Sequence, residues 1–149
     1  MSCLIISGIV LILDQLSKYL IENNLYKSSI DIIENVFSLT YVENYGAAWG
    51  IFSDNNWIIL VLTPILVTLI ILYLYKFSKN KLEYISGGLI IGGAIGNYLD
   101  RIVRGYVVDF FDVKIWPVFN VADIGIVVGC IVMIILFILE GKNDGEIRF

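Results

Sequence analysis

Four long apolar segments, separated by shorter polar stretches, dominate the hydropathy pattern of the chain. They cover residues 1 to 20, 57 to 75, 84 to 99 and 124 to 139, and the second of them contains no charged residue. A helix needs about 20 residues to cross the hydrocarbon of a bilayer, so the third and fourth segments need a few flanking polar residues to reach that length. The pattern predicts four transmembrane helices.

The stretch between the first two apolar segments has a different pattern. Residues 36 to 42 alternate and are rich in β-branched and aromatic side chains, which predicts a short strand. Residues 44 to 52 are expected to form a turn and a short interfacial helix, with Trp49 and Phe52 facing lipid. No repeat or linker divides the chain. We therefore expect one membrane-embedded domain, residues 1–149, that is all-α apart from a small β-containing loop region outside the cytoplasm.

The distribution of lysines indicates the orientation. The short turn between the second and third segments carries Lys76, Lys79 and Lys81, and short loops rich in basic residues favour the cytoplasmic side. Both termini are then expected in the cytoplasm, and the loops 22–56 and 101–120 outside it. The second of these outer loops also contains basic residues, which weakens the argument there.

Composition narrows the possible chemistry. The 149 residues are 58% hydrophobic and only 16% charged, with a net charge of −4. Soluble domains carry closer to a quarter of charged residues, and no basic patch suggests nucleic acid as a partner. Histidine is absent, and the two cysteines, Cys3 and Cys130, lie in apolar runs. A zinc-type metal site and Ser-His-Asp or Cys-His catalysis are therefore not expected.

Two aspartates at the edges of apolar segments are the main chemical clue. Asp109 lies in Val-Val-Asp-Phe, in the loop between the last two segments, and Asp123 ends Phe-Asn-Val-Ala-Asp. Carboxylates near hydrocarbon are costly and usually functional. If the two share a site, one can be protonated while the other is ionised, as acid–base hydrolysis requires. A helix N-terminus favours ionised Asp123, so Asp123 is the expected base and Asp109 the expected acid.

The predicted topology brings the charged and amide side chains of the apolar segments to one side of the membrane. We therefore expect a polar cluster near the outer leaflet. Its expected members are Asp14, Asn97, Asp100, Arg101, Asp109 and Asp123.

Simpler explanations exist for several of these residues. Asp14 and Lys18 are four residues apart and could form only an ion pair. The same spacing relates two pairs at the end of the third segment, which could anchor a helix at the headgroups. These pairs are Asn97 with Arg101, and Asp100 with Arg104.

Glycines and a capping pattern also have structural explanations. Gly88, Gly92 and Gly96 recur every four residues, which is typical of close helix packing in lipid. Asn120 and Asp123 match a capping box at the start of a helix, and a cap alone would explain both residues.

Five segments, in order, resemble motifs of the lipoprotein signal peptidases, also called signal peptidase II. They are Asp14-Gln-Leu-Ser-Lys18, Asn44-Tyr-Gly-Ala-Ala-Trp-Gly50, Gly92-Gly-Ala-Ile-Gly-Asn-Tyr-Leu-Asp-Arg101, Val107-Val-Asp-Phe110 and Phe119-Asn-Val-Ala-Asp123. Each motif alone would be weak evidence. Five in order, with the apolar segments in matching places, are specific.

The resemblance implies an intramembrane aspartyl endopeptidase that removes the signal peptide of a bacterial prolipoprotein by cutting before its diacylglyceryl-modified cysteine. Asp109 and Asp123 would be catalytic, and Asp100 would act structurally within the bundle. The other supporting or substrate-contacting positions implied by the motifs are Asp14, Lys18, Asn44, Gly46, Asn97, Arg101, Asn120 and Ala122.

The same resemblance implies the partners and the location. The expected partners are lipid-modified prolipoproteins and membrane lipid, with no metal or organic cofactor. The enzyme is expected as a monomer in the bacterial cytoplasmic membrane, with its site near the outer leaflet. Two competing hypotheses are a non-enzymatic four-helix transporter or channel subunit with a buried Asp/Arg ion path, and a protease that cuts within the hydrocarbon.

Overall fold

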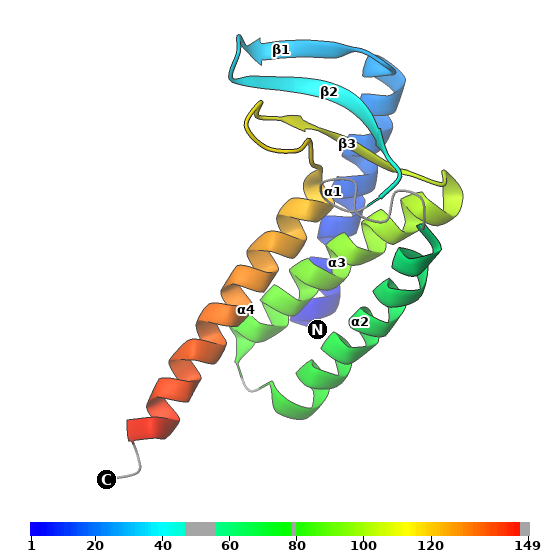
Figure 1. The fold of residues 1–149 in the computed structure, drawn as a ribbon. Helices are drawn as coiled ribbons and strands as arrows, with labels where there is room; N and C mark the ends of the chain where they lie inside the picture. Colours follow the sequence, from blue (N-terminus) through cyan, green and yellow to red (C-terminus); the bar gives the residue numbers. More distant parts are fainter. Residues whose placement is uncertain (47–55, 79, 147–149) are drawn as a thin grey trace.

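The computed structural model describes residues 1–46, 56–78 and 80–146 of the chain (Figure 1). This part contains four helices and three strands. The helices are α1 (Ser2–Leu25), α2 (Asn56–Phe77), α3 (Lys81–Val103) and α4 (Val121–Glu146). The strands are β1 (Ser29–Ile33), β2 (Phe37–Asn44) and β3 (Val107–Asp112). The four apolar segments thus correspond to four helices, each of which extends beyond its apolar segment.

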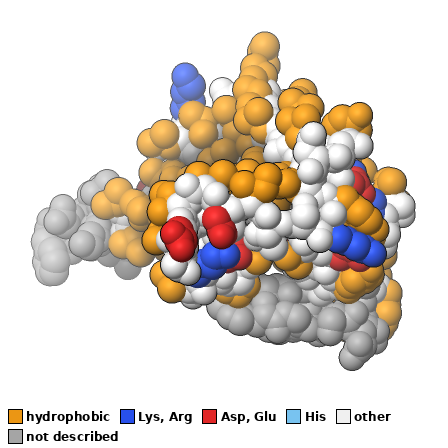
Figure 2. Space-filling view, turned by 90° about the horizontal axis from the view of Figure 1, so that it is seen from above, with side chains coloured by type: hydrophobic (Ala, Val, Ile, Leu, Met, Phe, Trp, Pro, Cys, Tyr) orange, Lys and Arg blue, Asp and Glu red, His pale blue; other side chains and the backbone are white. Residues whose placement is uncertain are grey.

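Within the described residues, three helices are long and apolar enough to cross a membrane: Ser2–Leu25, Trp57–Phe77 and Val121–Gly141. Large apolar side chains on all three are exposed, as expected for surfaces that face lipid. The sheet end of the molecule carries charged side chains in small groups among apolar ones (Figure 2). These features make the chain a membrane protein.

Helix α3 differs because other helices surround it. It packs against α1, α2 and α4, and it carries buried polar side chains, including Glu83 and Asp100. Because these polar side chains are enclosed by protein, α3 can be less apolar than the three candidate spans, whose surfaces face lipid. The predicted crossing by a fourth helix stays a prediction.

The glycines of α3 permit close helix packing. A Cβ atom at Gly88 would lie 2.7 Å from the carbonyl oxygen of Cys3, and one at Gly92 would lie 2.6 Å from that of Ser7. A Cβ at Gly96 would lie 2.5 Å from Asp14 Oδ2. The packing explanation for the glycine repeat is therefore confirmed, because α1 approaches α3 directly over these positions.

The strands form one antiparallel sheet in the order β1-β2-β3, at the end of the bundle where α1 ends and α4 begins (Figure 1). The predicted strand is confirmed as β2. Asp109 was expected in a loop, and this is wrong: it lies in β3, opposite Val42 of β2. The buried side chains of Ile21 on α1 and Val108 on β3 belong to one apolar cluster that seats the sheet on the bundle. Most of the expected interfacial helix, including Trp49 and Phe52, lies outside the described residues.

Candidate functional site

Asn120 connects the two candidate catalytic carboxylates. Its side-chain amide donates a hydrogen bond to Asp109 Oδ1 at 2.6 Å. Its side-chain oxygen accepts the backbone N–H of Asp123 at 3.0 Å, and its own backbone N–H donates to Asp123 Oδ2 at 3.2 Å. The predicted capping box is therefore present. The same asparagine also joins the first turn of α4 to strand β3.

Two further asparagines complete the surroundings of the carboxylates. Asn97 on α3 donates to Asp123 Oδ1 at 2.8 Å. Asn44, at the end of β2, donates to Asp109 Oδ2 at 2.8 Å and accepts the backbone N–H of Gly46 at 2.9 Å. Each carboxylate thus receives hydrogen bonds on both of its oxygens.

The two carboxyl groups have different environments. Asp109 is 2% exposed, whereas Asp123 is only partly buried. Burial, together with the negative charge of Asp123, raises the pKa of Asp109 to about 7, although hydrogen bonds from Asn44 and Asn120 oppose the shift. Near neutral pH, Asp109 can therefore hold a proton beside a second carboxyl group that is open to approach.

Arg101 is turned toward this cluster. Its Nη2 donates to the carbonyl oxygen of Gly46 at 2.6 Å, and its Nη1 donates to that of Asn97 at 3.2 Å. These bonds tie the end of β2 to α3. Its Nε is buried and has no hydrogen-bond partner within the described part of the chain. The fork holds protein carbonyls, which the headgroup-anchor explanation does not predict.

A buried ionic cluster lies beside the carboxylates. Lys18, Asp14 and Asp100 all have fully buried side chains, and Lys18 Nζ lies 2.8 Å from both Asp14 Oδ2 and Asp100 Oδ2. Arg104 Nη1 lies 2.7 Å from Asp100 Oδ1. The predicted pairs Asp14–Lys18 and Asp100–Arg104 are thus present. Removing one partner of such a buried pair costs about 3–5 kcal/mol, so the cluster fixes α1 against α3.

The ionic cluster and the carboxylate pair are connected at two points. Asp14 Oδ1 accepts the backbone N–H of Ala122, the residue before Asp123, at 2.9 Å. Lys18 Nζ donates to Asn97 Oδ1 at 2.9 Å. Hydrogen bonds and ion pairs therefore connect all the named candidate site residues, with Gly46 and Ala122 contributing backbone groups.

Sequence reasoning missed Gln15 as a member of the cluster. Its Nε2 donates to Asp100 Oδ1 at 3.0 Å and to the carbonyl oxygen of Gly96 at 3.2 Å. The available signal was its place next to Asp14, as a second polar residue within an apolar helix. The described residues hold no group of three or more Cys, Asp or Glu that could bind a metal.

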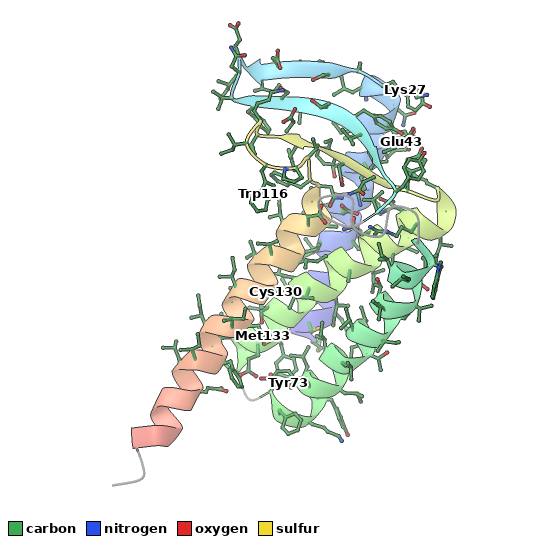
Figure 3. All side chains as sticks on the ribbon, viewed as in Figure 1. Lys27, Glu43, Tyr73, Trp116, Cys130 and Met133 are labelled. Atoms are coloured by element: carbon green, nitrogen blue, oxygen red, sulfur yellow. The ribbon has the colours of Figure 1, made fainter. Side chains whose placement is uncertain are left out.

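An apolar recess of about 410 Å³ lies away from these polar residues. Tyr73 of α2 and Met133 of α4 belong to its lining, in the half of the bundle opposite the sheet (Figure 3). The recess therefore does not contain the candidate chemistry, which lies where β3, α3 and α4 meet.

Known proteins resemble the chain over nearly its full length. A family model described as Signal peptidase (SPase) II matches residues 6–139. A lipoprotein signal peptidase of Halothermothrix orenii is 44% identical over 139 residues, covering 93% of this chain and 95% of that protein. Two solved structures, each described as a bacterial membrane enzyme obtained by the in meso method, give TM-scores of 0.90 and 0.83. They are 32% and 33% identical and cover 95% and 91% of this chain, and 90% and 91% of their own chains. The chain therefore belongs to the signal peptidase II family, as its five motifs predict.

Proposed function

We propose that this protein is an aspartyl endopeptidase of a bacterial membrane. It removes the signal peptide from prolipoproteins by cutting before the diacylglyceryl-modified cysteine. The observation that carries the proposal is the shared contact of Asp109 and Asp123 with Asn120, combined with their unequal burial. Family membership supports the peptidase activity and the class of substrate.

The proposed reaction begins with a water molecule between the two carboxyl groups. Ionised Asp123 takes a proton from the water while the water oxygen attacks the scissile carbonyl carbon. Protonated Asp109 gives its proton to the carbonyl oxygen, which stabilises the tetrahedral intermediate. Collapse of the intermediate breaks the C–N bond. Asp123 then returns its proton to the leaving amine. One hydroxyl of the intermediate gives its proton back to Asp109 as the new carbonyl forms, which leaves the cleaved peptide with a carboxylic acid that ionises in water.

The raised pKa of Asp109, about 7, supports this division of roles. An acid that keeps its proton near neutral pH can protonate the carbonyl oxygen, whereas an ordinary aspartic acid would already be ionised. Asp123 accepts hydrogen bonds from the side chain of Asn97 and from the backbone N–H of Asn120, so both of its oxygens face donors.

Arg101 is proposed to contact substrate. Its Nη atoms hold Gly46 and Asn97, which leaves Nε as a buried donor beside the carboxylate pair. A peptide carbonyl on either side of the scissile bond would satisfy this donor. An unsatisfied buried donor is costly, so a substrate contact would add binding energy there.

The membrane arrangement is also proposed. Helix α3, with 23 residues, is about 35 Å long, which suffices for a bilayer core of about 30 Å. Its buried polar groups face other helices and do not prevent it from crossing. The end of α2, which carries Lys76, and the start of α3, which carries Lys81, lie at the end of the bundle opposite the sheet (Figure 1). This fits cytoplasmic termini and a site near the outer leaflet.

The transporter hypothesis is less favoured because the buried charged residues, apart from Glu83 at the opposite end of α3, gather near the sheet, where Asp14, Lys18 and Asp100 pair with one another. An ion path would need polar groups at successive depths across the membrane.

The proposed function is tested with purified enzyme and a prolipoprotein in diacylglyceryl-modified and unmodified forms. We expect release of the signal peptide only from the modified form. Equal cleavage of both forms would contradict the proposed substrate class, and cleavage of neither would contradict the activity.

A further inference from the structure

Three asparagine side chains surround the carboxylate pair, and a donor that cannot accept a hydrogen bond orients each of them. The backbone N–H of Gly46 bonds to Asn44 Oδ1, and that of Asp123 bonds to Asn120 Oδ1. The amide nitrogen of each asparagine then faces a carboxylate. An amide in the reverse orientation would direct its oxygen at a carboxylate oxygen, which disfavours the ionised form.

Asn97 differs from the other two asparagines, because the donor that orients its side chain is a charged side chain and not a backbone N–H. Lys18 Nζ donates to Asn97 Oδ1 at 2.9 Å, and Asn120 Nδ2 donates to the same oxygen at 3.1 Å. Asn97 Nδ2 consequently faces Asp123 Oδ1 at 2.8 Å. The ammonium group carries no acceptor, so it enforces this orientation of the carboxamide.

Lys18 is itself held in place. Its side chain is fully buried, and Nζ lies 2.8 Å from Asp14 Oδ2 and from Asp100 Oδ2. With Asn97 Oδ1, these contacts surround the ammonium group, so it cannot move away from the carboxamide without losing an ion pair. Lys18 could neutralise Asp14 and Asp100 without contacting Asn97. Its hydrogen bond to Asn97 therefore indicates a role beyond charge balance.

We propose that Lys18 is a positioning residue that determines where the single proton of the carboxylate pair resides. By holding the Asn97 amide nitrogen toward Asp123, it keeps Asp123 ionised and leaves the proton on Asp109. This inference rests on the proposed function, because it assigns a role within the aspartyl mechanism.

The charged groups around the pair come from several elements. Arg101 of α3 and Asp109 of β3 lie within electrostatic reach of Asp123, while Glu22 and Arg104 pair at the outer side of the cluster. Among the described residues, the charged groups that these contacts connect are Asp14, Lys18 and Glu22 on α1, Asp100, Arg101 and Arg104 on α3, Asp109 on β3 and Asp123 on α4. In this set Lys18 donates to the side-chain oxygen of Asn97, whereas Arg101 donates to its backbone carbonyl, which does not orient the carboxamide.

The test must separate positioning from charge balance. Lys18→Met combined with Asp14→Asn removes one cation and one carboxylate together, so no extra charge is left buried. The Asp14→Asn single variant, which keeps the contact between Lys18 and Asn97, is its reference. Arg104→Met combined with Glu22→Gln is the matched control, because it removes one charge of each sign from the same cluster without touching Asn97.

The readout is the pH dependence of kcat and of KM, measured with diacylglyceryl-modified prolipoprotein. Relative to Asp14→Asn, we expect the Lys18→Met double variant to lower kcat at least tenfold and to change KM less than threefold. The acidic limb of its kcat profile should move to higher pH, because protonation of the working base becomes easier. The Arg104→Met double variant should retain the wild-type acidic limb. An unchanged kcat and acidic limb in the Lys18→Met double variant would overturn the proposal.

Asn97→Leu provides a second test if the Lys18→Met double variant does not fold. Leucine is close in size to asparagine and adds no charge, so Lys18 keeps its ion pairs with Asp14 and Asp100, but it cannot donate to Asp123. The acidic limb should again move to higher pH, and an unmoved limb would refute the proposal. Asp109→Asn and Asp123→Asn are assayed in parallel. Turnover by these two would contradict the aspartyl mechanism, whereas their inactivity beside an unaffected Lys18→Met double variant would contradict only the role of Lys18.

Discussion

Substitution of Gly96 by alanine should damage the buried ionic cluster. A Cβ atom at this position would lie 2.5 Å from Asp14 Oδ2 and 3.1 Å from Asp14 Cγ. Asp14 cannot retreat freely, because Oδ2 pairs with Lys18 at 2.8 Å and Oδ1 accepts the backbone N–H of Ala122 at 2.9 Å. The carboxylate or the whole of α1 must therefore shift.

The size of the effect follows from opposing contributions. Alanine stabilises a helix by up to about 1 kcal/mol relative to glycine. Overpacking a tight interior costs about 1–3 kcal/mol, and complete loss of a buried ion pair costs about 3–5 kcal/mol. If the pair between Asp14 and Lys18 is weakened but not lost, the net cost for Gly96→Ala is about 2–4 kcal/mol.

Thermal unfolding in one detergent measures this effect. A loss of 1 kcal/mol lowers Tm by about 2–4 °C for a chain of this size, so Gly96→Ala should lower Tm by about 5–15 °C. Gly8→Ala is the matched control, because a Cβ at Gly8 of α1 would contact nothing within 4 Å apart from its chain neighbours and the backbone of its own helix. Its Tm should stay the same or rise slightly. Equal Tm values for both alanine variants would refute the tight contact between Gly96 and Asp14.

Three further predictions concern the site and the topology. Arg101→Lys should lower turnover at least tenfold, which is about 1.4 kcal/mol of transition-state stabilisation, because lysine cannot reproduce the planar fork on Gly46. Its Tm should change little. Wild-type turnover would favour the explanation that Arg101 only anchors the helix at the headgroups. In a variant without the two native cysteines, an impermeant thiol reagent added from outside should label Ile115→Cys and spare Lys81→Cys, and the reverse pattern would overturn the orientation. The raised pKa of Asp109 predicts that kcat falls as pH rises through about 7, since the acid loses its proton there, and a flat profile to pH 9 would contradict that role.

Local sequence spacing predicted part of the site. The ion pairs Asp14–Lys18 and Asp100–Arg104 join residues four apart on one helix, and the capping contact between Asn120 and Asp123 spans three residues. Helical geometry alone brings such residues together, so they can be inferred without knowledge of the fold.

Contacts between elements could not be inferred in the same way. The bond from Lys18 to Asn97 joins residues 79 apart in the chain, and the bond from Asn44 to Asp109 joins residues 65 apart. Each depends on how α1 and β2 are placed against α3 and β3. Spacing could suggest a common side of the membrane, but it could not assign partners or hydrogen-bond direction.

The strands show the same division. The alternating residues 36 to 42 predicted β2. Strand β1, Ser-Ile-Asp-Ile-Ile, also alternates but is short and was not predicted, whereas β3 gave no alternating signal. Strand β3 reads Val-Val-Asp-Phe-Phe-Asp, and all of its residues from Val107 to Phe110 are buried. Pairing with β2 makes this segment a strand, as the register of Val42 with Asp109 illustrates. The helices were predicted too short because their terminal turns contain polar residues, which an apolar pattern does not detect.

The central claim is that Asp109 and Asp123 together perform the hydrolysis. The most direct measurement is single-turnover cleavage of diacylglyceryl-modified prolipoprotein by Asp109→Asn and Asp123→Asn, with Asp112→Asn as the control. Asp112 lies on the same strand as Asp109 but pairs with Lys114 away from the site. We expect both site variants to be folded and inactive, because asparagine is nearly isosteric but cannot exchange a proton, while Asp112→Asn keeps wild-type turnover. Substantial cleavage by a pure preparation of either site variant would contradict the account.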